Sequence, residues 1–171
     1  MGLIHLYCGD GKGKTTASIG LAVRCAGAGG RVVFAQFFKD GSSAELNVLR
    51  TLPGVTVLVC PTKYGFFKNM TEEKKAAARA DYTALLESAL AAAGDADLLV
   101  LDEAVSACNH GVIPEARLLA FLGDRPEGLE VAVTGREPSA ALEEKADYVT
   151  EMVKRRHPFD RGIAARKGVE F

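Results

Sequence analysis

The sequence has few of the features that mark several common protein classes. Its 171 residues contain no tryptophan, and the formal net charge is only −1. Proteins that bind duplex nucleic acid usually carry a large basic excess, so this balance argues against a nucleic-acid partner. No apolar run approaches the length of about 20 residues that crosses a membrane as a helix, and no leader precedes the first apolar segment at Leu3. No membrane partner is therefore expected.

Cysteine is scarce and widely spaced. The four cysteines, Cys8, Cys25, Cys60 and Cys108, form no CxxC pair and no Cys/His cluster with zinc spacing. We therefore expect reduced thiols in a cytoplasmic protein.

The composition, in contrast, supports a sizeable core. Hydrophobic residues make up 48% of the chain, and no repeat, linker or low-complexity segment divides it. A single domain over residues 1–171 is expected. Basic residues gather late in the chain, from Lys154 to Lys167. Such a run is either a solvated face or a site for an anionic ligand.

Short apolar segments alternate with segments of helical periodicity. The predicted strands are 3–7, 31–38, 55–59, 98–101, 129–133 and 148–153. Helices are predicted after the first strand to about residue 26, at 44–50, from an N-cap at Thr71 to about 90, near 114–122 and near 139–146. This alternation predicts an α/β fold with a mostly parallel sheet that is covered on both faces.

The stretch CGDGKGKTT at 8–16 follows the first strand and opens a helix. It resembles the phosphate-binding pattern Gly-x4-Gly-Lys-Ser/Thr, except that Cys8 stands at the first glycine position. Its glycines would let backbone N–H groups wrap a phosphate, Lys14 would reach phosphate oxygens, and Thr15 would place its hydroxyl on Mg²⁺. The residues expected to bind ATP are Gly9, Asp10, Gly11, Lys12, Gly13, Lys14, Thr15, Thr16 and Arg136.

Two acidic residues, Asp102 and Glu103, end an apolar strand. Ligands of open parallel sheets bind outside the carboxyl ends of the strands, so these carboxylates, the loop at 9–16 and the turn at 134–136 should meet at one edge. Together with Thr15 they predict a magnesium site, and the pattern leaves open which carboxylate contacts the metal. His5 and His110 show no arrangement typical of a general base, so these residues predict nucleotide binding without naming a reaction.

Three further stretches, together with this loop, resemble the P-loop class of ATP:corrinoid adenosyltransferases. The loop is similar to that family's Gly-Asn-Gly-Lys-Gly-Lys-Thr-Thr, Gln36-Phe37 to its Gln-Phe, and residues 134–136 to its Thr-Gly-Arg turn. The tail 157–162, His-Pro-Phe-Asp-Arg-Gly, and the closing Gly-Val-Glu-Phe at 168–171 resemble the family's last motifs. The resemblance runs from about residue 3 to 171 and implies a three-layer, P-loop NTPase-like (RecA-like) domain.

The resemblance implies a distinct use of ATP. The Co(I) centre of a corrinoid attacks the 5′ carbon of ATP, the adenosyl group moves to cobalt, and tripolyphosphate leaves. Lys14 would stabilise the leaving triphosphate, and Thr15 and Glu103, with Asp102 beside them, would hold Mg²⁺. Arg136 would add charge near the nucleotide, or else cap a helix at the surface. The implied corrinoid-binding residues are Gln36, Phe66, Phe67, His157 and Phe159.

Two departures from the family pattern stand out. Many members carry Gly-Phe-x-Trp after the third strand, whose aromatics displace the lower axial ligand of the corrinoid. Here the stretch is Gly-Phe-Phe-Lys at 65–68, so Phe66 matches, Lys68 takes the tryptophan position, and Phe67 is the available substitute. These two rings are either catalytic or folded into the core. Some members also have an N-terminal helix over the corrinoid, which we do not expect here.

The resemblance further implies a homodimer and a flavoprotein or other reductase that supplies Co(I). Two other interpretations of the sequence remain. A small P-loop kinase or ATPase would produce ADP, and a non-catalytic nucleotide or corrinoid carrier would bind these ligands without turnover.

Overall fold

Six strands form one sheet in the computed structural model, which describes residues 1–39, 41–65 and 67–170. The strands are β1 (Ile4–Cys8), β2 (Val32–Gln36), β3 (Val55–Val59), β4 (Leu98–Asp102), β5 (Glu130–Thr134) and β6 (Tyr148–Glu151). Their order is β3-β2-β4-β5-β1-β6, and every neighbouring pair is parallel. The predicted α/β fold is confirmed.

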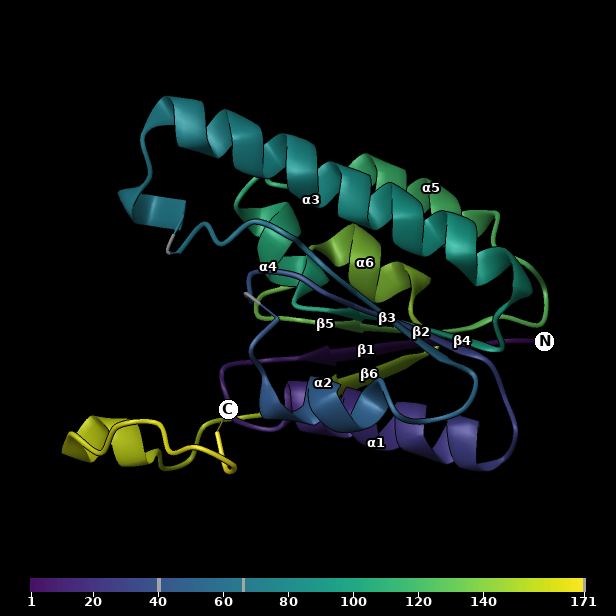
Figure 1. The fold of residues 1–171 in the computed structure, drawn as a ribbon, viewed down its shortest axis with the longest axis horizontal. Coiled ribbons are helices and arrows are strands. Elements are labelled where there is room, and N and C mark those ends of the chain that lie inside the picture. The colour runs from purple at the N-terminus through teal and green to yellow at the C-terminus, as the bar shows by residue number, and fades with distance from the viewer. Residues whose placement is uncertain (40, 66, 171) are drawn as a thin grey trace.

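Helices cover both faces of this sheet (Figure 1). They are α1 (Lys14–Gly27), α2 (Ala44–Leu49), α3 (Glu72–Ala92), α4 (Ala104–Asn109), α5 (Glu115–Gly123) and α6 (Ala140–Lys145). In Figure 1, α1 and α2 lie on one face, and the other four helices lie on the opposite face. The result is the predicted three-layer arrangement, consistent with a P-loop NTPase-like domain.

Two hydrophobic clusters, one on each face, explain why β4 is apolar from Leu98 to Leu101. In β4, Leu98 and Val100 join the cluster of α1 and α2, while Leu99 and Leu101 join the cluster of the other helices. Successive side chains of a strand point to opposite faces, so a strand covered on both sides is apolar at successive positions, and the buried polar residue of β4, Asp102, stands at its carboxyl end.

Local signals set some element ends as predicted. Thr71 caps α3, because its side chain accepts a hydrogen bond of 3.3 Å from the N–H of Lys74. The last strand ends at Glu151, two residues earlier than predicted. Beyond it the chain turns to the loop after β1, where Gly11 N–H donates to the Met152 carbonyl at 2.6 Å. The sequence leaves open whether a loop or a short helix precedes His110, and the structure shows helix α4 there.

None of the helices within the described ranges combines the length and the apolar character needed to cross a membrane.

Candidate functional site at the carboxyl edge of the sheet

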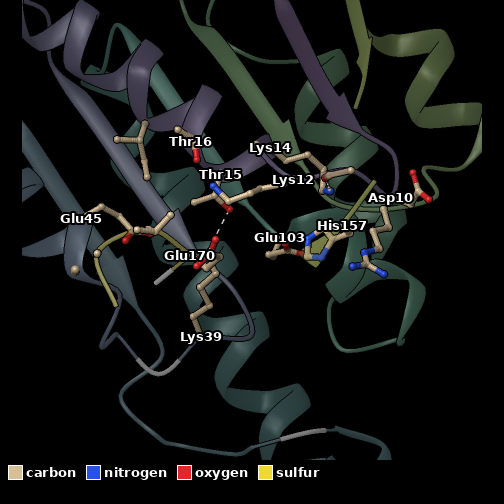
Figure 2. A pocket seen from close by; sticks show the side chains of 17 residues that line it. Asp10, Lys12, Lys14, Thr15, Thr16, Lys39, Glu45, Glu103, His157 and Glu170 are labelled. Atoms are coloured by element: carbon tan, nitrogen blue, oxygen red, sulfur yellow. Dashed lines mark hydrogen bonds between the residues drawn. The ribbon is translucent and has the colours of Figure 1, made fainter. Parts of the chain in front are cut away.

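The ends of β1, β4 and β5 meet around a cavity of about 440 Å³, which we call the P-loop cavity. It is lined by residues 10–16, Glu103, Arg136 and His157, among others. Figure 2 shows these elements converging from different parts of the chain. The structure therefore brings together the residues predicted for ATP and the metal, apart from Gly9 and Asp102, which do not line the cavity.

The chain that follows β6 packs so closely on the loop that Gly9 and Gly11 have no room for a side chain. A Cβ atom on Gly9 or Gly11 would lie 2.5 or 2.6 Å from the Met152 carbonyl oxygen. Gly9 and Gly13 also have φ angles of 93° and 119°, which favour glycine. A further contact comes from Lys154, whose backbone N–H donates a hydrogen bond to Asp10 Oδ1 at 2.9 Å. This hydrogen bond lowers the pKa of the Asp10 carboxyl. The loop is thus fixed by close packing on its outer side.

Cys8 belongs to the strand and not to the loop. It is the last residue of β1, it is buried, and its Sγ lies 3.8 Å from the Thr150 carbonyl oxygen in β6. Burial raises the pKa of this thiol. The Cys8 side chain therefore packs against β6 and does not line the P-loop cavity.

Lys14 spans the inside of the loop. Its Nζ donates to the carbonyl oxygens of Gly9 and Gly11, each at 2.8 Å, and only 7% of the residue is exposed. Burial lowers the pKa of its ammonium group. The side chain lines the P-loop cavity, so its positive charge faces the space that the loop encloses.

Asp102 is fully buried at the end of β4 and is the centre of a hydrogen-bond network. Its Oδ1 accepts from Thr134 Oγ1 at 2.8 Å. Its Oδ2 accepts from Gln36 Nε2 at 3.0 Å and from Thr15 Oγ1 at 3.2 Å. Lys39 Nζ completes the set at 3.4 Å from Oδ2. The network joins β2, β4 and β5 to the start of α1.

Glu103 has a different place from its neighbour. It adopts a left-handed conformation, with φ at 62°, and lines the P-loop cavity. Ser106 Oγ donates to Glu103 Oε2 at 2.6 Å, and the Glu103 N–H donates to Thr134 Oγ1 at 2.9 Å. Asp102 therefore supports the site from the buried side, while Glu103 lines the wall of the P-loop cavity.

The donor atoms at this edge suit a magnesium ion. Thr15 and Asp102 offer oxygens only, and Glu103 adds a carboxylate at the wall. Gln36 Oε1 is buried beside them without a hydrogen-bond partner. Within the described ranges, no group of three or more His, Cys, Asp or Glu side chains is arranged to hold a metal. Mg²⁺ commonly takes one or two protein oxygens and fills its octahedron with water and substrate phosphates, so the residues fit this ion.

The turn at residues 134–136 uses each of its residues. Thr134 holds Asp102, as described above. Gly135 has a φ of 150°, and a Cβ there would lie 2.6 Å from the Cβ of Val105 in α4. Arg136 is exposed and lines the P-loop cavity, which favours the predicted position near the nucleotide over a surface cap alone.

A second cavity, of about 470 Å³, adjoins the first, and we call it the aromatic cavity. Phe38, Tyr64 and Tyr82 line it, and Lys39 and Glu170 line both cavities. The Phe38 ring packs edge-on against Tyr82, with centroids 5.5 Å apart. The two cavities thus adjoin at Lys39 and Glu170.

The residues predicted for the corrinoid do not all meet. The Gln36 side chain is fully buried against Asp102 and presents no surface to a ligand, because the end of β2 is a central position of the sheet. His157 lines the P-loop cavity, whereas Phe159, in a short 3₁₀ helix, is 75% exposed and lines neither cavity. Phe66 lies outside the described residues.

Phe67 lies beside the aromatic cavity and not deep in the core. It is partly buried, its ring centroid is 6.5 Å from that of Phe38, and it packs edge-on near His110. Lys75 Nζ and the Arg79 guanidinium lie 5.8 and 5.7 Å from its ring centroid. These two cations hold the ring beside the N-terminal turns of α3.

Neither histidine considered as a base lines the P-loop cavity. His5, within β1, contacts Glu130 and stacks on Tyr148 with centroids 4.6 Å apart. His110 Nδ1 lies 2.8 Å from the Ser106 carbonyl oxygen, and its ring packs edge-on against Phe38 at 5.4 Å. Both rings have structural contacts that account for their positions.

Sequence reasoning missed three contributors to this edge: Lys39, Glu170 and the anchoring role of Thr134. Lys39 follows β2 by three residues, so the rule that loops after parallel strands converge would have found it. Glu170 could not be placed from its position in the tail. Arg166 pairs with it at 2.9 Å, and this hydrogen-bonded pair lowers the pKa of Glu170 to about 2.

Comparison with known proteins agrees with this geometry. Residues 1–171 match the family described as ATP:corrinoid adenosyltransferase BtuR/CobO/CobP. A corrinoid adenosyltransferase of Pseudomonas aeruginosa is 36% identical over 171 residues, which is 99% of this chain and 84% of that protein. The corrinoid adenosyltransferase of Escherichia coli K12 and corrinoid adenosyltransferase CobA of Salmonella typhimurium are each 32% identical, over 99% of this chain and 86% of theirs.

Proposed function

Because the chain belongs to the family of ATP:corrinoid adenosyltransferases, it is a transferase that adenosylates corrinoids with ATP, and we propose how its residues carry out this transfer. The observation that carries the proposal is the pair of adjoining cavities, one lined by the phosphate-binding loop and the other by aromatic rings. One substrate would occupy each cavity, and the reacting atoms would meet beside Lys39.

The triphosphate would lie in the P-loop cavity and depart as intact tripolyphosphate. As the bond to the 5′ carbon breaks, negative charge grows on the leaving oxygen. Lys14, the loop N–H groups and Arg136 are the donors that would stabilise this charge. The loop is held in place before reaction by its packing on the segment after β6, and Lys14 by its hydrogen bonds to Gly9 and Gly11, so these donors need little reorganisation.

Mg²⁺ would be held by Thr15 and Glu103, with Asp102 orienting the threonine hydroxyl from below. When bound, the ion supplies positive charge that neutralises the phosphate oxygens of the leaving group. The protein's own part is to fix the oxygens. Thr134 and Gln36 hold Asp102, and Ser106 holds Glu103.

The corrinoid would occupy the aromatic cavity, with its cobalt facing the nucleotide. Phe38, Tyr82 and Phe67 offer flat apolar surfaces for a macrocycle. A Co(I) nucleophile carries no proton, so the transfer needs no general base, in keeping with the positions of His5 and His110 outside the P-loop cavity. Positioning and exclusion of water are then the main tasks of the protein.

The direct experiment mixes the protein with Mg-ATP and a chemically reduced corrinoid under anaerobic conditions. Formation of a Co–C bond, followed by its visible absorption spectrum, is the expected result. Binding of both substrates without any Co–C product would support a carrier and contradict the proposal. Release of ADP in place of the adenosylated corrinoid would indicate the kinase or ATPase alternative.

Further parts of the proposal concern the protein as a whole. We propose a single catalytic domain over residues 1–171, a homodimer, a cytoplasmic location and a reductase partner that supplies Co(I). All four cysteines are free thiols, which supports the location. Light scattering tests the dimer, and Co–C formation from a Co(II) corrinoid with an added flavoprotein reductase tests the partner.

A further inference from the structure

Lys39 contacts two oxygens at the proposed magnesium site: the Thr15 hydroxyl, which would bind the ion, and the Asp102 carboxylate, which orients that hydroxyl. Its Nζ lies 3.3 Å from Thr15 Oγ1 and 3.4 Å from Asp102 Oδ2, and those oxygens are 3.2 Å apart. Figure 2 shows the Lys39 side chain extending toward Thr15 at the floor of the P-loop cavity. Among the described residues, no other Lys or Arg side chain forms an ion pair with Asp102.

The charge of Asp102 explains this contact. The carboxylate is fully buried, and a buried charge is costly unless it is paired and hydrogen-bonded. Thr134, Gln36 and Thr15 donate hydrogen bonds but bring no positive charge. Lys14 is committed to the carbonyl oxygens of its own loop. The compensating charge therefore comes from Lys39.

An ammonium group and a magnesium ion cannot use the Thr15 hydroxyl oxygen together. Mg²⁺ requires its ligands at about 2.1 Å, and a cation placed that close to Thr15 from the cavity side would meet Nζ. Lys39 has room to move, because its side chain is 32% exposed and lines both cavities. If the Lys39 ammonium moved from Asp102 to the cavity wall, its charge would lie beside the triphosphate.

We propose that Lys39 is a positioning residue that neutralises Asp102 in exchange with the magnesium ion, and this inference rests on the proposed Mg²⁺–ATP site. The ammonium keeps Asp102 and Thr15 in register before the ion binds. It also competes with bare divalent cations, so the site accepts the metal when ATP phosphates supply the remaining ligands. Lys39 thereby sets the preference of the site for the metal–nucleotide complex over free metal.

The test measures Mn²⁺ binding by electron paramagnetic resonance, with and without ATP. The variants are Lys39→Met and Lys39→Gln; the glutamine amide still donates to Asp102 if the methionine variant does not fold. Lys74→Met is the matched control, since it removes one charge from the exposed first turn of α3. Circular dichroism verifies the fold of each variant.

Without ATP, the neutral Lys39 variants should bind Mn²⁺ at least about tenfold more tightly than the wild type, because a competing charge at ion-pair distance is gone. With ATP the difference should shrink, and Lys74→Met should match the wild type throughout. If the wild type binds Mn²⁺ with ATP, but the Lys39 variants bind Mn²⁺ without ATP no more tightly than the wild type does, the inference about Lys39 is overturned and the proposed metal site stands. If Mn²⁺ does not bind even with ATP, the proposed metal site fails as well.

Discussion

The substitution Thr134→Val tests whether the network around Asp102 organises the carboxyl edge. Thr134 is fully buried, and valine keeps its shape while removing the hydroxyl. That hydroxyl donates to Asp102 Oδ1 at 2.8 Å and accepts from the Glu103 N–H at 2.9 Å. One substitution therefore weakens the support of both acidic residues without creating a cavity.

The expected loss of stability follows from these two bonds. A hydrogen bond to a charged group contributes about 1.5 to 3 kcal/mol, and one between neutral groups, such as that from the partly buried Glu103 N–H, about 0.5 to 1.5 kcal/mol. Since the two effects share one hydroxyl, we expect Thr134→Val to lower the free energy of unfolding by about 2 to 5 kcal/mol. A typical domain has about 5 to 15 kcal/mol in total, so the effect is large.

Urea unfolding followed by circular dichroism measures this change as a shift of the midpoint. Thr150→Val, on the exposed strand β6, is the matched control and should stay within about 0.5 kcal/mol of the wild type. Thr134→Ser, which retains the hydroxyl, should recover most of the loss. If Thr134→Val and Thr150→Val unfolded at the same urea concentration, the network would not stabilise the protein as argued.

Three more predictions concern other parts of the site. Lys14→Ala should lower the rate of corrinoid adenosylation at least about 100-fold while the fold survives, and wild-type turnover of a folded variant would contradict its role. Gly135→Ala should lower the free energy of unfolding by more than about 1 kcal/mol, because its Cβ would lie 2.6 Å from that of Val105. An unchanged urea midpoint would show that α4 can shift to make room for the added Cβ without loss of stability. Burial raises the pKa of Cys108 to about 12 from 9.0, so its thiol ionises first in the unfolded chain and stability should fall as the pH rises from 9 toward 12. Urea titrations at pH 8 and pH 10.5 measure this loss, and the free energy of unfolding should fall less between the two pH values in Cys108→Ala than in the wild type. An equal fall in both proteins would argue against this cause.

Much of the fold could be predicted because its signals are local. The apolar run of β4 predicts a strand covered on both faces, and Thr71 followed by Glu72 and Glu73 predicts the start of α3. The sequence left open whether a loop or a short helix precedes His110, because helix α4 starts directly after Glu103, whose left-handed conformation no sequence pattern indicates.

The candidate site was predictable in its residues more than in their roles. The rule that carboxyl ends of parallel strands converge predicted that Thr15, Asp102 and Arg136 lie at one edge. It could not separate a buried Asp102 from a cavity-lining Glu103, because that difference depends on contacts from β2 and β5. Cys8 at the first loop position likewise depends on β6, against which it packs.

The measurement that tests the central claim most directly is ³¹P nuclear magnetic resonance of the products. Protein, Mg-ATP and a Co(I) corrinoid are incubated without oxygen, and the phosphorus species are counted against the Co–C product. The account predicts one intact tripolyphosphate for each adenosylated corrinoid, and no ADP. ADP and phosphate formed in step with ATP consumption, with no Co–C product, would contradict it.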